Sequence, residues 1–223
     1  MDFLMARTAH FTFNGFQTGC YVIWDESGRC TIVDPGCSTP AELSQLKNFV
    51  AEKSLTPVCI MLTHGHFDHI FGVAEISRTY DIPVYMNPKE KQTLDYNAQS
   101  VRMFGMQAPE EFETVDVADG DTIVVGDLKF EVIETPGHTA GGVCYLEREA
   151  KVIATGDTIF AGTIGRTDLP GGDYDVMMRS IFEKLLMLEG DTRILPGHGP
   201  SSDISTERMT NPFLLPFNEP LED

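Results

Sequence analysis

The most informative residues of this 223-residue chain are its histidines, because five of the six follow apolar, strand-like runs. The densest group lies in the run Thr63-His64-Gly65-His66-Phe67-Asp68-His69. In an extended segment alternate side chains point the same way, so His64 and His66 can bind one metal ion together. Asp68 and His69 lie where the chain turns into the next helix, and they can face a second ion. The spacing His-x-His-x-Asp-His therefore presents two pairs of metal ligands on one loop.

Three further candidate ligands, each next to a glycine, follow later strand-like runs: His138, Asp157 and His198. The neighbouring glycines allow tight backbone bends that can bring these side chains to a shared point. Imidazole nitrogen combined with carboxylate oxygen suits zinc, iron or manganese, and does not suit calcium or magnesium. The sequence therefore predicts a metal site. The sixth histidine, His10, lies within the first predicted strand, where we expect a structural role.

The segments that must position these residues alternate between strand-like and helical patterns. Strands are predicted at residues 8–13, 20–25, 30–33, 57–62, 122–125, 129–133, 143–147, 152–155 and 193–195, with a short one at Val84. Thr39, Pro40 and Glu42 form the start of a capped helix, and further helices are expected at about 70–79 and 176–188. Residues 87–113 are helical or irregular. This mixture indicates a layered α/β fold in which helices cover the sheets.

The composition is that of a globular protein, and the length predicts one domain, 1–223, on which residues 203–223 pack as a C-terminal extension. Its 16 Lys and Arg stand against 34 Asp and Glu, and this net charge of −18 disfavours nucleic acid as a partner. No stretch approaches the roughly 20 apolar residues of a membrane span. The first ten residues lack the apolar core of a signal peptide, so we expect a cytoplasmic protein. The cysteines are expected to be free, buried thiols: Cys20, Cys30, Cys37, Cys59 and Cys144.

The ligand pattern resembles the metallo-β-lactamase superfamily. The resemblance rests on the histidine-rich motif of residues 64–69, on the three later ligands in the same order, and on Asp34 in Val33-Asp34-Pro35-Gly36, which matches the superfamily's first motif. It covers about residues 11–200 and implies a four-layered αββα sandwich with metals at one edge of the two sheets. Within the superfamily, residues 156–168 and the tail resemble the short glyoxalase II-like branch. The tail residues that match are Glu207, Arg208, Asn211, Pro212 and Phe213.

The resemblance also implies a role for each ligand, with two divalent ions, zinc first and iron or manganese as alternatives. The first ion would be bound by His64, His66 and His138. The second would be bound by Asp68, His69 and His198, and Asp157 would bridge both. Asp34 would orient a ligand or its loop, although a turn residue before Pro35 explains this position nearly as well.

Such a site predicts a hydrolase whose substrate is a small-molecule thioester. Two ions about 3.5–4 Å apart can share a water and lower its pKa toward neutrality. The resulting hydroxide would attack the thioester of S-lactoylglutathione or a related compound, with Asp68 and Asp157 as the catalytic carboxylates. No Ser or Cys nucleophile is needed, and the chain has no Gly-x-Ser-x-Gly motif. Arg166 is expected to bind a substrate carboxylate, unless it forms a salt bridge with Asp168 or Asp173.

Several alternatives remain open. Asp168 occupies a position that is aromatic in glyoxalase II, and the C-terminal helical domain of that enzyme is largely absent, so a different thioester fits equally well. A persulfide dioxygenase binds one iron through two His and one Asp of the same motif and is the first alternative. A β-lactamase and a nuclease are disfavoured, the latter by the net charge of −18. A non-catalytic metal-binding module is the remaining alternative, and the full set of seven ligands argues against it.

Overall fold

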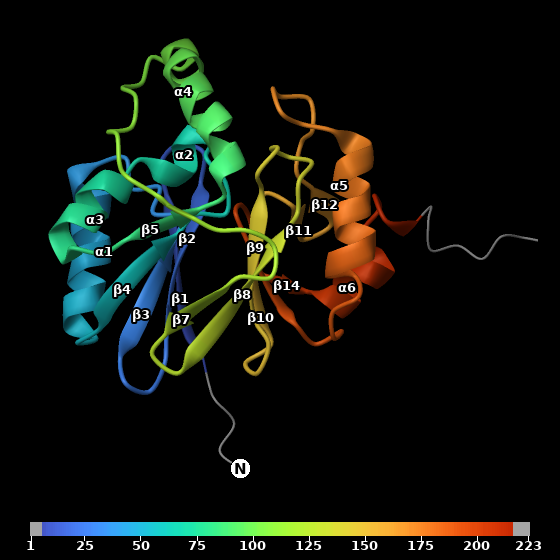
Figure 1. Ribbon diagram of the computed structural model, residues 1–223, viewed down its shortest axis with the longest axis horizontal. Coiled ribbons are helices and arrows are strands. Elements are labelled where there is room, and N and C mark those ends of the chain that lie inside the picture. Colours follow the sequence, from blue (N-terminus) through green and yellow to red (C-terminus); the bar gives the residue numbers. More distant parts are fainter. Residues whose placement is uncertain (1–5, 216–223) are drawn as a thin grey trace, which may run out of the picture.

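Two six-stranded sheets form the centre of the computed structural model, which describes residues 6–215 apart from the side chain of residue 98 (Figure 1). The first sheet has its strands in chain order: β1 (Arg7–Phe13), β2 (Thr18–Trp24), β3 (Arg29–Val33), β4 (Thr56–Met61), β5 (Val84–Met86) and β6 (Val115–Asp116). Strands β1 to β3 are antiparallel, and β3 to β6 are parallel.

The second sheet has the order β14 (Ser202–Asp203), β13 (Arg193–Pro196), β10 (Val152–Gly156), β9 (Val143–Glu147), β8 (Leu128–Glu134) and β7 (Thr122–Val125). Within it only β10 and β13 are parallel neighbours. A separate small hairpin pairs β11 (Ile159–Phe160) with β12 (Thr163–Ile164). The β7–β8 turn is the predicted one, with Gly126 at a φ of +63° that favours glycine.

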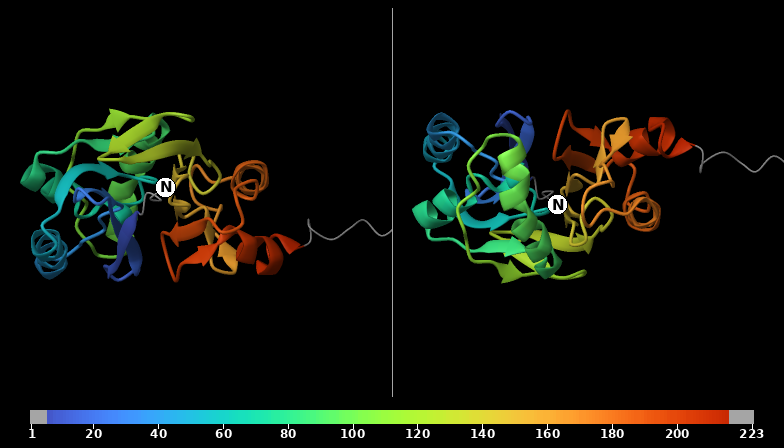
Figure 2. Two further views of the ribbon diagram at one scale, coloured as in Figure 1. Left: turned by 90° about the horizontal axis from the view of Figure 1, so that it is seen from below. Right: turned by 90° about the horizontal axis from the view of Figure 1, so that it is seen from above.

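Helices cover the outer face of each sheet, which confirms the predicted αββα sandwich (Figure 2). The helices next to the first sheet are α1 (Pro40–Glu52), α2 (Phe67–Ile70), α3 (Val73–Tyr80) and α4 (Lys91–Met103), the last following a 3-10 turn, η1 (Pro88–Glu90). Those next to the second sheet are α5 (Tyr174–Ser180), the π-helical turn η2 (Ile181–Leu185) and α6 (Ile204–Thr210). The capping box of α1 is present as predicted, with Glu42 accepting from the backbone at Thr39.

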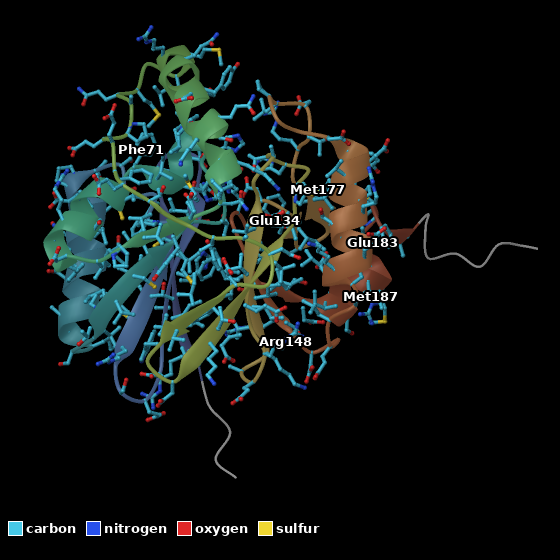
Figure 3. The ribbon with its side chains drawn as sticks, in the orientation of Figure 1. Phe71, Glu134, Arg148, Met177, Glu183 and Met187 are labelled. Carbon is cyan, nitrogen blue, oxygen red and sulfur yellow. The ribbon has the colours of Figure 1, made fainter. Side chains whose placement is uncertain are left out.

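The core consists of three apolar layers, because both faces of each sheet are buried. On β2, Val22 packs toward α1 and α3, whereas Tyr21 packs between the two sheets. Met177 on α5 lies fully buried against the second sheet, whereas Met187, two residues after η2, lies at the molecular surface with 76% of its area exposed (Figure 3). Ile204 and Leu214 are buried in this same outer layer, so the described part of the C-terminal segment packs on the second sheet.

The structure differs from the sequence-based expectation at several short elements. The single helix expected at 70–79 is divided into α2 and α3, because Gly72 closely approaches Pro35 and donates its N–H to the Pro35 carbonyl at 2.8 Å. A Cβ at position 72 would lie 2.7 Å from that oxygen. The two-residue strands β6, β11, β12 and β14 were not predicted, since two residues carry no detectable periodicity.

The sandwich brings several strand ends to one edge. A loop that carries one or more predicted ligands directly follows each of four strands: β4, β8, β10 and β13. The loop after β8 and helix α2 both lie at the upper end of the sheets, α2 beneath α4 and the loop beside the lower end of α4 (Figure 1). Within residues 6–215, every helix is too short or too polar to cross a bilayer.

Candidate metal centre

The loop after β4 places its four candidate ligands by changing from extended to helical backbone. His66 is the last extended residue, with φ −63° and ψ 143°, and α2 begins at the next residue. Asp68 and His69 lie in the first turn of α2 and are both buried. The later ligands depend on glycines with positive φ, +136° at Gly137 and +48° at Gly156. Side chains larger than hydrogen disfavour that backbone, so these positions require glycine.

His64, His66 and His138 form what we call the three-histidine group. Their ligand atoms lie within 4.8 Å of one another, and His138 Nε2 is 2.9 Å from His66 Nδ1. His64 and His138 are buried, and His66 is half-buried. The three nitrogens face a common point, as the ligands of one ion must.

Asp68, His69 and His198 form a second cluster, the mixed group, whose ligand atoms also lie within 4.8 Å of one another. His69 Nε2 is 3.4 Å from His198 Nε2 and 3.5 Å from Asp68 Oδ2. Asp157 lies between the two groups. Its Oδ1 is 3.4 Å from His69 Nε2, and its Oδ2 is 3.5 Å from both His138 Nε2 and His198 Nε2.

Four of the imidazoles are oriented by hydrogen bonds on the side away from the site. Nδ1 of His138 donates to the Arg166 carbonyl at 2.7 Å, and Nδ1 of His198 donates to the Phe16 carbonyl at 3.1 Å. A carbonyl oxygen only accepts, so each Nδ1 carries a proton, and Nε2 is left as the nitrogen that faces the site and can bind a metal ion. A metal ligand needs this tautomer.

Asp34 fixes the proton on Nδ1 of one histidine in each group, His64 and His69. Its Oδ2 accepts from His69 Nδ1 at 3.0 Å and from Thr63 Oγ1 at 2.6 Å, and its Oδ1 accepts from Thr63 N at 2.8 Å. Because the Thr63 hydroxyl donates to Asp34, it accepts from His64 Nδ1, which lies 3.0 Å away. Asp34 therefore keeps a proton on Nδ1 of both His64 and His69 and leaves their Nε2 atoms facing the site.

The donor atoms fit divalent metal ions. Among residues 6–215, three buried side-chain atoms have no hydrogen-bond partner: His64 Nε2, Asp157 Oδ1 and Thr139 Oγ1. Two of the three belong to predicted ligands and point into the clusters. Leaving such atoms without a partner costs free energy, which coordination of an ion would offset. The mixture of imidazole nitrogen and carboxylate oxygen suits zinc, iron or manganese.

Protons occupy part of this site when no metal is bound. Burial lowers the pKa of His64, and it lowers that of His66 to about 4, so both are neutral. Burial also opposes the charge on His69 and His198, but Asp157 and Asp68 outweigh it and raise both values, that of His198 to about 9. A metal ion must displace these protons, so its binding depends on pH.

Two polar residues that sequence reasoning missed support Asp68. Thr18 Oγ1 donates to Asp68 Oδ2 at 2.8 Å, and Asn14 Nδ2 donates to the Asp68 carbonyl at 2.8 Å. Both lie at the turn between β1 and β2, far from the motif in sequence. The Asn-Gly pair at 14 and 15 predicts a turn and gives no sign of this second role.

An open cleft of about 470 Å³ adjoins the site. Its lining residues are His138, Asp157, Phe160, Ala161, Thr163, Arg166, His198, Gly199 and Pro200. Arg166 forms a two-point salt bridge with Asp168, with Nε to Oδ1 at 2.7 Å and Nη2 to Oδ2 at 2.8 Å. The alternative predicted for Arg166 is therefore present, although the guanidinium also lines the cleft. His10, by contrast, stacks on Tyr21 outside the clusters, with ring centres 4.6 Å apart.

A four-layered sandwich with histidines and carboxylates gathered at one sheet edge defines a class of metal-binding proteins. The chain belongs to the metallo-beta-lactamase superfamily, whose family model matches residues 13–198. It is 39% identical to "Probable metallo-hydrolase YqgX" of Bacillus subtilis over 91% of this chain and 94% of that protein. It is 35% identical to "Hydroxyacylglutathione hydrolase GloC" of Haemophilus influenzae, over 89% of this chain and 93% of the relative.

Solved structures agree with this assignment. The B3 metallo-beta-lactamase BLEG-1 superposes with a TM-score of 0.86 at 34% identity, covering 93% of this chain and 99% of that one. TTHA1623 in a di-iron-bound form has a TM-score of 0.83 at 32% identity, with 92% and 100% covered. ETHE1 from Myxococcus xanthus has a TM-score of 0.75 at 25% identity, with 98% and 93% covered. Family and site together support a metal-dependent hydrolase.

Proposed function

We propose that this protein hydrolyses a small-molecule thioester with the help of two divalent metal ions, zinc first and iron or manganese as alternatives. The observation that carries the proposal is the place of Asp157, whose carboxylate lies against both ligand groups: Oδ2 is 3.5 Å from Nε2 of both His138 and His198, and Oδ1 is 3.4 Å from His69 Nε2. One carboxylate between two three-ligand groups is the arrangement that two neighbouring ions require. The relative named as a hydroxyacylglutathione hydrolase supports the thioester class.

The residues around the site suit a reaction in which water attacks a carbonyl. When two ions are bound, they lower the pKa of a water and polarise the carbonyl oxygen of the substrate. Asp68 stays ionised because His69 and the bonds from His198 and Thr18 outweigh the effect of burial and lower its pKa. Its carboxylate can therefore accept a hydrogen bond and orient the attacking water. A thiolate leaving group, with a thiol pKa of about 8.5, needs little protonation.

No side-chain nucleophile is part of this proposal. All five cysteines are buried and free, and burial raises the pKa of each thiol, to about 12 at Cys37 and about 11 at Cys144. A protonated, buried thiol is a poor nucleophile. In the cleft we assign Arg166 to a carboxylate of the substrate, in exchange for its partner Asp168.

A persulfide dioxygenase is the second candidate, because it would use one iron held by two histidines and one aspartate, and the clusters supply these ligand types. That reaction needs one iron and oxygen, so metal content and product distinguish the two proposals. Two iron or zinc ions per chain with cleavage of a thioester support the hydrolase. One iron per chain with sulfite production supports the dioxygenase.

The test combines metal analysis with hydrolysis of S-lactoylglutathione by the purified protein, with a cephalosporin as the comparison substrate because of the likeness to BLEG-1. His66→Ala should abolish thioester cleavage and lower the metal content. His10→Ala is the matched control, since His10 stacks on Tyr21 outside both groups, and it should retain activity. Unchanged hydrolysis in His66→Ala, or absence of thioester cleavage by the metal-loaded protein, would refute the proposal.

A further inference from the structure

Gly65, which lies between His64 and His66, is held at both its N–H and its carbonyl by side chains of residues 88–103, the η1 turn and helix α4, which we call the α4 segment. Its N–H donates to Glu90 Oε2 at 2.7 Å, and its carbonyl accepts from Asn97 Nδ2 at 2.8 Å. Glu90 ends the η1 turn, and Asn97 lies at the end of the second turn of α4. The backbone between His64 and His66 is thus fixed by residues some thirty positions later in the chain.

The second oxygen of Glu90 reaches the other loop of the three-histidine group. Glu90 Oε1 accepts from Gly141 N at 2.8 Å, and Gly141 lies three residues after His138. Glu90 itself has no exposed surface. The fit is close, because a Cβ on Gly141 would lie 2.9 Å from Glu90 Oε1 and one on Gly65 would lie 3.1 Å from Glu90 Oε2.

The η1 turn, which carries Glu90, is also held to strand β8 by side-chain contacts. Asn87 Nδ2 donates to Glu134 Oε1 at 2.8 Å, and Lys89 Nζ lies 3.0 Å from Glu134 Oε2. Glu134 is the last residue of β8, four positions before His138, and it is labelled near the middle of the view in Figure 3. The η1 turn is therefore anchored to the same sheet edge from which His138 extends.

We propose that Glu90 is a positioning residue for the metal, and that through it the α4 segment sets the affinity of the three-histidine group. A buried carboxylate costs free energy unless its oxygens are hydrogen-bonded, and here both oxygens bond to ligand-bearing loops. Zinc–nitrogen bonds of about 2.0–2.1 Å require the loops of His64, His66 and His138 to keep a fixed separation. One rigid carboxylate spanning both loops provides that separation. The inference concerns metal affinity, and it stands even if the substrate is not a thioester.

The experiment titrates metal-free protein with zinc in competition with a chromophoric chelator. Glu90→Gln keeps the shape of the side chain but turns an amide N–H₂ toward one of the two backbone N–H groups. We expect 10- to 100-fold weaker zinc binding, the usual range for a lost partner of a metal ligand. Glu147→Gln is the matched control, because Glu147 is also buried and accepts backbone N–H bonds from Ala150 and Lys129, at the far end of β9.

Two variants that each lack one ligand show whether Glu90→Gln acts on the three-histidine group or on the mixed group. In His198→Ala, where the mixed group lacks a ligand, Glu90→Gln should still weaken zinc binding. In His66→Ala, where the three-histidine group is already damaged, it should add nothing. Wild-type affinity in Glu90→Gln, an equal loss in Glu147→Gln, or the same effect in both backgrounds would overturn the proposal.

If Glu90→Gln does not fold, Asn97→Ala replaces it. Asn97→Ala should weaken zinc binding several-fold, and an unchanged affinity in that variant would overturn the proposal as well.

Discussion

Replacing Asp34 by asparagine tests the proton arrangement of the site, because this one side chain directs a histidine in each ligand group. If the asparagine keeps its oxygen toward Thr63 N, its N–H₂ faces the Thr63 hydroxyl and His69 Nδ1, which now accept. His69 must then carry its proton on Nε2. The Thr63 hydroxyl must donate to His64 Nδ1, so His64 also moves its proton to Nε2. Both metal-facing lone pairs are lost.

The opposite orientation of the asparagine is also unfavourable. In this orientation the asparagine oxygen faces His69 and the Thr63 hydroxyl, so both histidine tautomers are kept. Its N–H₂ then takes the place of Asp34 Oδ1, which lies 2.8 Å from Thr63 N, and two N–H donors face each other. Either arrangement disturbs a hydrogen-bond partner of metal ligands. Loss of such a partner weakens metal binding at the site concerned by 10- to 100-fold, about 1.4–2.7 kcal/mol. We therefore expect Asp34→Asn to lower zinc affinity by this factor at both groups.

Zinc competition titrations measure the affinity, and ¹⁵N spectra of the metal-free protein report the tautomer of His64, which is neutral because burial lowers its pKa. Asp25→Asn is the matched control. Asp25 is equally buried and accepts three hydrogen bonds, from Ser27 N, Ser27 Oγ and Asp127 N, at the opposite end of β2. The reasoning would be refuted if Asp34→Asn bound zinc like the wild type, or if Asp25→Asn lost as much affinity.

Three further predictions concern protons and charges. The pKa of His198 in the metal-free fold, about 9, lies above its unfolded value of about 6.5, so its contribution to stability is complete below pH 6.5 and disappears as the pH rises to 9. The urea midpoint of metal-free protein should fall over this range, and zinc uptake at pH 7.5 should release protons to an indicator dye; a flat midpoint without proton release would contradict the assignment. Asp168→Asn should free Arg166 and lower the KM for S-lactoylglutathione by about 1.4- to 5-fold, the worth of an exposed ion pair, with kcat unchanged. A higher KM would show that Asp168 itself contributes to binding. The five buried thiols, with pKa values raised to about 11 at Cys144, should resist iodoacetamide at pH 8 until the protein unfolds. Rapid alkylation of a native cysteine would contradict the buried placement.

Much of the fold could be predicted from local patterns. The capping box at Thr39 and Glu42 depends on residues three positions apart, and the β7–β8 hairpin depends on its glycine turn. Apolar runs such as 57–62 correctly indicated strands covered on both faces. The break between α2 and α3 was missed, because it results from contact with Pro35, more than thirty residues earlier in the chain.

The candidate ligands were also visible in the sequence, because each must follow a strand, and histidines and aspartates beside glycines mark such ends. The spacing separated His64 and His66 from Asp68 and His69. The assignment of His138, His198 and Asp157 depends on how the two sheets stack, and it came from the resemblance. Arg166 shows the same limit. Its type and position suggested a substrate contact, yet only the folded loop shows the salt bridge to Asp168.

The sequence by itself determined which side chains could bind metal. Ligand chemistry depends on residue type, and the tight turns that carry the ligands depend on the neighbouring glycines. The tertiary structure alone decided how those side chains are held. The bonds of Asp34 to His69, of Thr18 to Asp68 and of Glu90 to Gly141 join residues 35, 50 and 51 positions apart. Hydrogen bonds require atoms to meet within about 3 Å, and for such distant residues only the packing of the two sheets brings them together.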